Sequence, residues 1–292
     1  NEAMQNASIG SDAFVSGQSM YPNSTTLAQQ AQQAGYDQAS AGFNAGLLQS
    51  AGSTSDAHQT PSYIKGQNAA LAVKDAEDNI ENGGNNVAFD SDSYQKATAG
   101  YQAAYQAVKQ SNDPLSLNDI LDASDANASN PAYSKAYKDA IDHLKSQYTQ
   151  GVQQFNDGKN TAQTAGVKSS YDTDILQKAF RDAQTAYHDG LNGTNSLSNN
   201  SALNDTNQAA KNVANAIAQA TKDADYDDVN GVIAAAKQAF ISNPMVDASQ
   251  YNAAPKYQEV YKASIAQFRA EYEKGINTVT VGNGQGMIGT TN

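Results

Sequence analysis

The sequence of 292 residues contains no cysteine, no tryptophan and only seven phenylalanines. Without cysteine the chain has no disulfide, no thiol nucleophile and no thiolate metal ligand. Most of its aromatic side chains are tyrosines, of which there are 16. We therefore expect a core of Ala, Leu, Ile, Val and Tyr, in which the phenol hydroxyls reach the surface or a hydrogen-bond partner.

Basic residues are scarce as well. The 18 Lys and Arg stand against 30 Asp and Glu, which gives a formal net charge of −12, and no basic cluster interrupts the acidic background. Nucleic-acid backbones and anionic membranes attract positive patches, so neither is an expected partner. No apolar run approaches the roughly 20 residues of a membrane span, and no signal segment opens the chain, so we expect no membrane insertion and a mature or excised polypeptide.

The remaining composition is rich in Asn, Gln, Ser, Thr and Ala, and poor in Lys. Together with the missing Cys and Trp, this composition is typical of secreted surface proteins of Gram-positive bacteria. We therefore expect an extracellular location, either secreted or at the cell surface.

An internal repeat organises the chain. The segment that begins at Tyr133 matches the segment that begins at Tyr257 at one constant offset, and a proline precedes each segment. The matched residues are Tyr133, Tyr137, Ile141, Tyr148 and Gly151 in the first copy and Tyr257, Tyr261, Ile265, Tyr272 and Gly275 in the second. Three further segments, which begin at Tyr36, Gln67 and Gly100, recur in the same order at Phe180, Asn207 and Gly231. Four elements repeated in one order indicate a duplication.

The motif Gly-x-x-x-Phe-x-x-Gly at 151–158 is echoed at 10–17 and, with Val for Phe, at 275–282. One interpretation is that residues 1–17 end a preceding repeat, and the other is a chance match in a glycine-containing chain. The first interpretation predicts helical units at 18–158 and 159–282, followed by a linker at 283–292.

The repeats are expected to be helical. Apolar residues from Tyr133 to Phe155 are spaced 4, 4, 3, 4, 4, 3, and the second copy has the same spacing. This eleven-residue period of about 3.67 residues per turn is close to that of an unstrained helix. The sequence therefore predicts an all-α fold of two tandem antiparallel four-helix units, in which the fourth helix has about 24 residues.

Local signals set the expected boundaries. Asn130 is a candidate N-cap before Pro131, and the third helices are expected at about 91–110 and 226–242. Loops are expected at 51–61, 81–90, 111–130, 192–202 and 243–254, and the glycines from about 280 onward suit a linker better than a helix. Gly35, Gly42 and Gly46 in one predicted helix indicate either close approach of a neighbouring backbone or a frayed helix.

The inventory of catalytic and metal-binding groups is thin. The three histidines, His58, His143 and His188, have no metal-ligand spacing and are expected at the surface. An EF-hand loop starting at Asp223 fails at its sixth and twelfth positions, Asp228 and Ala234. That run and the run from Asp122 are interpreted as solvated loops and helix caps. No serine elbow, phosphate loop or dinucleotide fingerprint is present, so we predict no catalytic, metal or cofactor-binding residue, no cofactor and no enzymatic activity.

Exposed tyrosines are the remaining candidates for ligand contact, because a flat apolar ring with a hydroxyl suits sugars and protein partners alike. Most of the tyrosines lie on the helical stripe and are expected in the core. The residues near predicted helix ends, Tyr21, Tyr63, Tyr171 and Tyr251, are the better surface candidates, with packing as the alternative for each.

Short helical motifs such as Tyr148-Thr-Gln-Gly151 and Phe155-Asn-Asp-Gly158, in a Cys-free background rich in Asn, Gln and Ala, resemble the helical repeat regions of surface adhesins and aggregation-promoting proteins of lactobacilli and related Gram-positive bacteria. The resemblance implies an adhesion or cell-aggregation module that binds a surface protein or glycan of a host or neighbouring cell, with self-association as a further option. A cell-wall sorting signal and a basic wall-binding domain are missing, which leaves the mode of anchoring open. The alternatives are a passive helical spacer and a polysaccharide-acting enzyme that uses an Asp/Glu pair.

Overall fold

The computed structural model describes residues 2–20, 26–48, 60–84, 90–223, 227–253 and 255–283. Over these ranges the regular elements are nine α-helices and three short 3₁₀ helices, which confirms the all-α prediction. The chain divides into two compact units, called unit 1 and unit 2 below. Unit 1 consists of residues 1–111, 117–146 and 166–173, and unit 2 consists of residues 112–116, 147–165 and 174–292. This division falls within α5 and α6, whereas the sequence analysis places a boundary after Gly158.

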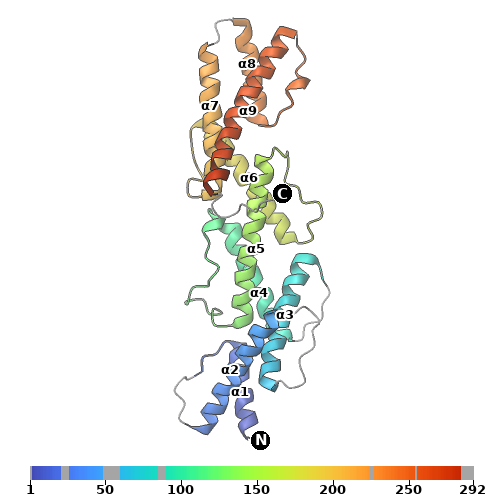
Figure 1. Ribbon diagram of the computed structural model, residues 1–292, viewed down its shortest axis with the longest axis vertical. Helices are drawn as coiled ribbons and strands as arrows, with labels where there is room; N and C mark the ends of the chain where they lie inside the picture. The colour runs from blue at the N-terminus through green and yellow to red at the C-terminus, as the bar shows by residue number, and fades with distance from the viewer. Residues whose placement is uncertain are drawn as a thin grey trace. The chain divides into compact units, whose positions relative to one another are not determined.

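Unit 1 contains α1 (Glu2–Ser16), α2 (Leu27–Leu48), α3 (Pro61–Asn82), α4 (Ser91–Gln110) and the first parts of α5 (Pro131–Asn156) and α6 (Ser170–Asn192). Helix α2 lies against α1 and α3, and α3 also lies against α4 (Figure 1). The core combines Phe43 and Val73 with many alanines, which let the helix axes approach closely. Because α3 has neighbours on several sides, it is buried over most of its circumference.

Unit 2 contains the 3₁₀ helix η1 (Pro114–Ser116), the remainder of α5 and α6, η2 (Ser201–Leu203), α7 (Asn204–Asp223), α8 (Asp227–Ser242), η3 (Ala248–Gln250) and α9 (Pro255–Asn283). Helix α9 packs against α7 and α8. The core of unit 2 contains four large aromatic side chains that are each at most 1% exposed, namely Tyr187, Phe240, Phe268 and Tyr272. The buried Tyr187 hydroxyl donates to the Phe240 carbonyl oxygen at 2.6 Å, as expected for a tyrosine-built core.

The predicted apolar stripes are buried in both copies. Side chains at Ile141, Leu144 and Tyr148 in α5, and at Ile265, Phe268 and Tyr272 in α9, are at most 1% exposed. The helices are longer than predicted, with 26 residues in α5 and 29 in α9. The linker prediction from about 280 is wrong as far as Asn283, because α9 continues to that residue. An isolated glycine such as Gly282 costs a helix only about 1 kcal/mol.

Equivalent contacts recur inside the two units. A Cβ added at Gly10 would lie 1.8 Å from the Gln32 carbonyl oxygen, and one at Gly151 would lie 2.6 Å from that of Leu176. A Cβ added at Gly46 or Gly190 would likewise lie 2.8 or 2.2 Å from the carbonyl oxygen of the aligned residues Gln67 and Asn207. The glycines of α2 are therefore explained by close helix approach rather than by fraying.

The aromatic contacts repeat in the same way. The Phe14 ring packs edge-on against Tyr36 with centroids 5.3 Å apart, and Phe155 packs edge-on against Phe180 at 5.4 Å. These matched contacts agree with a duplication and with α1 corresponding to the end of α5. The assignment of complete four-helix units stays a prediction.

Asn130 caps α5 as the sequence predicts. Its Oδ1 accepts from the Tyr133 amide at 3.0 Å, and its Nδ2 donates to the Val15 carbonyl oxygen at 3.0 Å. The side chain is 4% exposed. Asn130 thus provides a hydrogen-bond partner both for a backbone amide at the start of α5 and for a backbone carbonyl at the end of α1.

We expect Asn130→Ala to lower the free energy of unfolding by about 2 kcal/mol, because it removes a cap and leaves a buried carbonyl without its donor. Asn130→Ser keeps a neutral capping oxygen and removes only the donor to Val15, so it should cost less. Urea unfolding followed by circular dichroism measures both changes. Equal losses of unfolding free energy in the two variants would show that the capping hydrogen bond to Tyr133 contributes nothing of its own.

Candidate functional site

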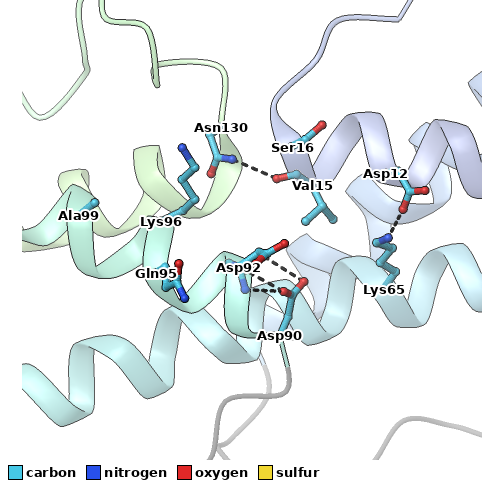
Figure 2. Close-up of a pocket in the computed structure, with 11 residues that line it drawn as sticks. Asp12, Val15, Ser16, Lys65, Asp90, Asp92, Gln95, Lys96, Ala99 and Asn130 are labelled. Atoms are coloured by element: carbon cyan, nitrogen blue, oxygen red, sulfur yellow. Dashed lines mark hydrogen bonds and ion pairs between the residues drawn. The ribbon is translucent and has the colours of Figure 1, made fainter.

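A hollow lies in unit 1, where the end of α1, the first half of α3 and the starts of α4 and α5 meet (Figure 2). Its volume is about 610 Å³, within the usual range for small-ligand sites. We call it the central hollow. Its lining residues are Asp12, Val15, Ser16, Lys65, Asp90, Asp92, Ser93, Gln95, Lys96, Ala99 and Asn130.

Two further hollows adjoin the central one, because they share lining residues with it. A hollow of about 570 Å³ between α3 and the start of α4 is also lined by Lys65 and Asp90. Another, of about 420 Å³, is lined by Lys65 together with Met4, Ala7 and Pro61. Lys65 lines all three hollows, and we call the three together the Lys65 groove.

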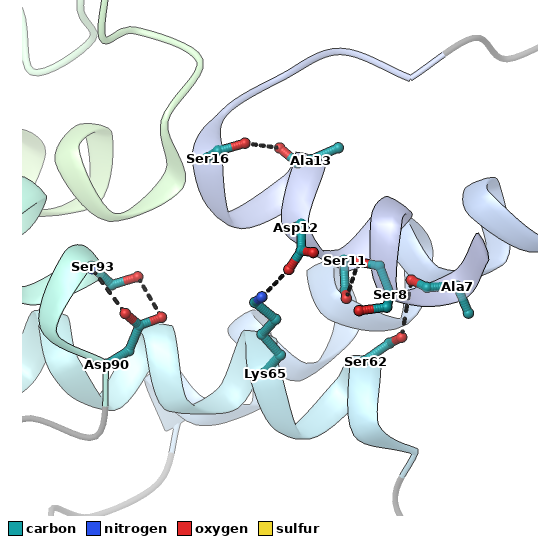
Figure 3. A network of polar contacts seen from close by, with 10 residues as sticks. All are labelled: Ala7, Ser8, Ser11, Asp12, Ala13, Ser16, Ser62, Lys65, Asp90 and Ser93. Atoms are coloured by element: carbon teal, nitrogen blue, oxygen red, sulfur yellow. Dashed lines mark hydrogen bonds and ion pairs between the residues drawn. The ribbon is translucent and has the colours of Figure 1, made fainter. Parts of the chain in front are cut away.

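Most of the charged groups in the central hollow already have partners. The Lys65 ammonium pairs with the Asp12 carboxylate across α1 and α3 (Figure 3). Asp90 is the N-cap of α4, and its Oδ1 accepts from the amides of Asp92 and Ser93 at 3.0 and 3.2 Å. The Lys96 ammonium donates to the Asn127 side-chain oxygen at 3.2 Å.

Two serine hydroxyls along the groove are oriented, one by a backbone carbonyl and the other by a carboxylate. Ser16 donates to the Ala13 carbonyl oxygen at 3.2 Å, and Ser93 donates to Asp90 Oδ2 at 3.2 Å (Figure 3). Each hydroxyl therefore keeps its acceptor capacity for a further partner. On α4, Asp92, Gln95 and Lys96 are exposed to solvent beside the hollow.

A second polar cluster lies within unit 1, between α3, α4, α5 and the start of α6. The Nε2 atom of His143 lies 3.0 Å from both carboxylate oxygens of Asp172, and its Nδ1 lies 3.8 Å from Glu81 Oε1. The Tyr101 hydroxyl donates to Glu81 at 3.2 Å. The prediction of a surface His143 is therefore wrong: its side chain is 27% exposed and lies between two carboxylates.

The carboxyl groups of this cluster are held in an apolar setting. Burial, reinforced by the neighbouring Asp139, raises the pKa of Glu77 to about 8, and Glu77 Oε1 has no hydrogen-bond partner. Burial also raises the pKa of Glu81. The hydrogen bond to Asp172 raises the pKa of His143, so that this imidazole favours its charged form.

This cluster lines none of the hollows that form the Lys65 groove. A pair of catalytic carboxylates would need to face each other across an open groove. The four acidic groups are instead packed between helices, so we assign the cluster a structural role. No group of three or more His, Cys, Asp or Glu side chains within the described residues is arranged to hold a metal ion.

Two of the tyrosines singled out by the sequence, Tyr171 and Tyr251, pack against other tyrosines. Tyr63, Tyr171 and Tyr251 are each half-buried. Tyr171 packs on Tyr105 with ring centroids 4.5 Å apart, and Tyr251 stacks on Tyr261 at 4.1 Å. These rings serve packing, while Tyr21 lies outside the described residues.

The remaining sequence candidates have local roles or lie outside the description. His188 is exposed, as expected, and its ring lies edge-on to Tyr187. In the run from Asp122, the Asp122 side chain accepts from the Ser124 amide at 2.8 Å, which agrees with the loop interpretation. His58 and residues 224–226 of the other acidic run lie outside the described residues.

The Lys65 groove was not predicted from the sequence. Its only local signal was Asp90 before Ser91-Asp92-Ser93, which is typical of an N-cap. Lys65 and Asp12 are far apart in the sequence, and only the packing of α1 on α3 brings them together.

Comparisons with known proteins identify no family. No family model matches the chain, and neither a curated protein nor a solved structure gives a significant match. Among the helices of the described residues, none has the length and apolar character needed to cross a membrane.

Proposed function

We propose that this chain is an adhesion or cell-aggregation module that acts outside the cell and binds a surface ligand of a host or neighbouring cell. The observation that supports this most is the Lys65 groove, an open set of adjoining hollows lined by hydrogen-bonding side chains. Such a lining suits recognition, because it offers donors and acceptors without a nucleophile and base aimed at one point.

The repeated helices support the same proposal. A surface module gains from rigid helical units that hold a site away from the cell, and repetition raises the avidity of weak sites. The net charge of −12 keeps such a protein soluble outside the cell. A secreted or cell-surface location is part of the proposal.

A passive spacer is the second candidate, because long helices with small-residue contacts also make stable helical units. A spacer needs no groove. Blocking the groove should therefore reduce cell binding by an adhesion module and leave the function of a spacer unchanged. A polysaccharide-cleaving enzyme is less well supported, since the acidic cluster around His143 does not open into the groove.

Blocking the groove tests the proposal. Ala99 is an exposed residue of α4 that lines the central hollow, and Ala266 is an exposed residue of α9 in unit 2. We expect Ala99→Trp to reduce binding of the purified protein to intact bacterial or epithelial cells at least tenfold, because the indole fills the hollow. The matched variant Ala266→Trp should bind like the original protein.

Flow cytometry of labelled protein on cells, with a co-aggregation assay beside it, provides the measurement. Equal binding by both tryptophan variants would contradict a role of the Lys65 groove in binding. Absence of any binding to cells, mucin, matrix protein or glycan would favour the spacer.

A further inference from the structure

We infer that the Lys65 groove binds an uncharged oligosaccharide, with one sugar in the central hollow and neighbouring sugars in the adjoining hollows. This inference rests on the proposed adhesion function and specifies its ligand.

The central hollow is nearly charge-neutral. It contains the three carboxylates of Asp12, Asp90 and Asp92 and the two ammonium groups of Lys65 and Lys96. The starts of α4 and α5 add only little positive charge, because Asp90 and Asn130 already accept from amides of their first turns. Since Lys65 is paired with Asp12 and Asp90 is held by backbone amides, one ammonium group, Lys96, and one carboxylate, Asp92, are left, so an ionic ligand meets charges of both signs.

The chain as a whole disfavours acidic ligands. Its net charge of −12 repels sialylated, sulfated or phosphorylated polymers at long range. Phosphate recognition would also need a cluster of arginines or free helix N-termini, and the N-terminus of α4 is already occupied by Asp90. An uncharged ligand is therefore favoured.

The free hydrogen-bonding capacity matches hydroxyl groups. The Gln95 amide offers donors and an acceptor, Asp92 offers acceptors, and the Lys65 ammonium has protons beyond the one directed at Asp12. A sugar hydroxyl donates and accepts at once, so it can bridge such mixed groups. Val15 and Ala99 provide small apolar surfaces for the C–H faces of a ring (Figure 2).

The further hollows beside Lys65 provide room for more than one sugar. The hollow of about 420 Å³ extends the site along α1 to Met4, Ala7 and Pro61, where apolar faces or acetyl methyl groups can pack. Met4 is 68% exposed and can adapt to its ligand. No aromatic ring lines these three hollows, so each sugar is expected to bind weakly and tight binding to require several units.

A peptide ligand fits less well. The usual modes of peptide recognition need an open strand edge, an aromatic-lined groove, a continuous apolar groove or an arginine cluster. Within the described residues the fold has no strand, and the three hollows are lined by no aromatic ring and no arginine, while charged side chains such as Lys65 interrupt their apolar surface.

The test titrates the whole protein with defined neutral oligosaccharides, and with sialylated and sulfated counterparts, by isothermal calorimetry and saturation-transfer NMR. We expect binding of at least one neutral oligosaccharide, weaker binding of its acidic counterparts, and at least tenfold weaker binding by Lys65→Gln. The matched control is Lys262→Gln, because Lys262 is a similarly exposed lysine that pairs with Glu259 in unit 2. This control should bind like the original protein.

Three results would overturn the inference: no neutral oligosaccharide bound at millimolar concentration, acidic counterparts bound more tightly, or equal binding by the two lysine variants. Cell binding separates this failure from failure of adhesion itself. If cells still bind in a protease-sensitive, periodate-resistant manner and Ala99→Trp abolishes it, adhesion stands and the ligand is a protein. If no cell binds at all, the proposed function fails.

Discussion

Gly66→Ala is expected to lower the free energy of unfolding of unit 1 by about 3 kcal/mol, since overpacking between two helices forces their backbones apart. A Cβ at this position would lie 1.8 Å from the Ala39 carbonyl oxygen, far inside contact distance. Unlike the end of a flexible side chain, this oxygen belongs to the backbone of α2 and cannot turn aside.

Gly231→Ala is the control. Gly231 is also helical, and an added Cβ there meets nothing within 4 Å. Alanine should stabilise this helix by about 0.5–1 kcal/mol. Denaturant unfolding with hydrogen exchange mass spectrometry measures both effects, with faster exchange of Gly66→Ala confined to α2 and α3. Loss of stability in both variants, or in neither, would contradict close helix approach as the reason for these glycines.

The second large effect is expected at Glu77. Its pKa in the folded protein is about 8, against an ordinary value of 4.5. The folded state therefore holds this proton more tightly than the unfolded chain does, and the associated stability is fully present below about pH 4.5. It is lost as the pH rises through about 8.

Other groups of the cluster act in the same direction. The raised pKa of Glu81 has the same sign. The raised pKa of His143 gives stability that is fully present below pH 6.5 and is lost as the pH rises through the higher pKa of the folded state. Asp119 and Asp189 have lowered pKa values, so their contribution is lost only below about pH 4. We therefore expect greater stability at pH 5 than at pH 8.

Glu77→Gln should remove most of this pH dependence and stabilise the protein at pH 8 by about 3 kcal/mol, given about 1.4 kcal/mol per pKa unit and a reduction for the nearby Lys135 and Asp139. The neutral amide keeps the shape of the carboxyl group and has no charge to bury. Thermal unfolding at pH 5 and pH 8 measures the change, and Glu259→Gln, at an exposed surface position, is the matched control. An original protein that is more stable at pH 8 than at pH 5 would contradict the assignment.

Much of the fold could be predicted from the sequence because the relevant signals are local. The spacing of Tyr133, Ile141 and Leu144 fixes a buried helical stripe, and Asn130 before a proline marks a helix start. The repeat was also visible in the sequence. The structure agrees with it, because Gly46 faces Gln67 and Gly190 faces Asn207, and these two pairs correspond to each other in the two copies.

The site could not be predicted in the same way. Lys65 meets Asp12, and His143 meets Asp172, only through helix packing, and nothing in the spacing of these residues marks them as partners. The expectation of a surface His143 was wrong because the buried face of α5 was inferred only from the spacing of its apolar residues. The side chain lies at the edge of that stripe, where the carboxylates of α3 and α6 surround it.

The most direct test of the central claim is a map of where a sugar binds. Backbone amide chemical shifts of the isotopically labelled protein are recorded during titration with a neutral oligosaccharide that it binds. The account predicts saturable shifts at Asp12, Lys65, Gln95 and Lys96, which disappear in Ala99→Trp and persist in Ala266→Trp. Saturable shifts confined to unit 2 or to other surfaces of unit 1, with these four amides unchanged, would contradict it.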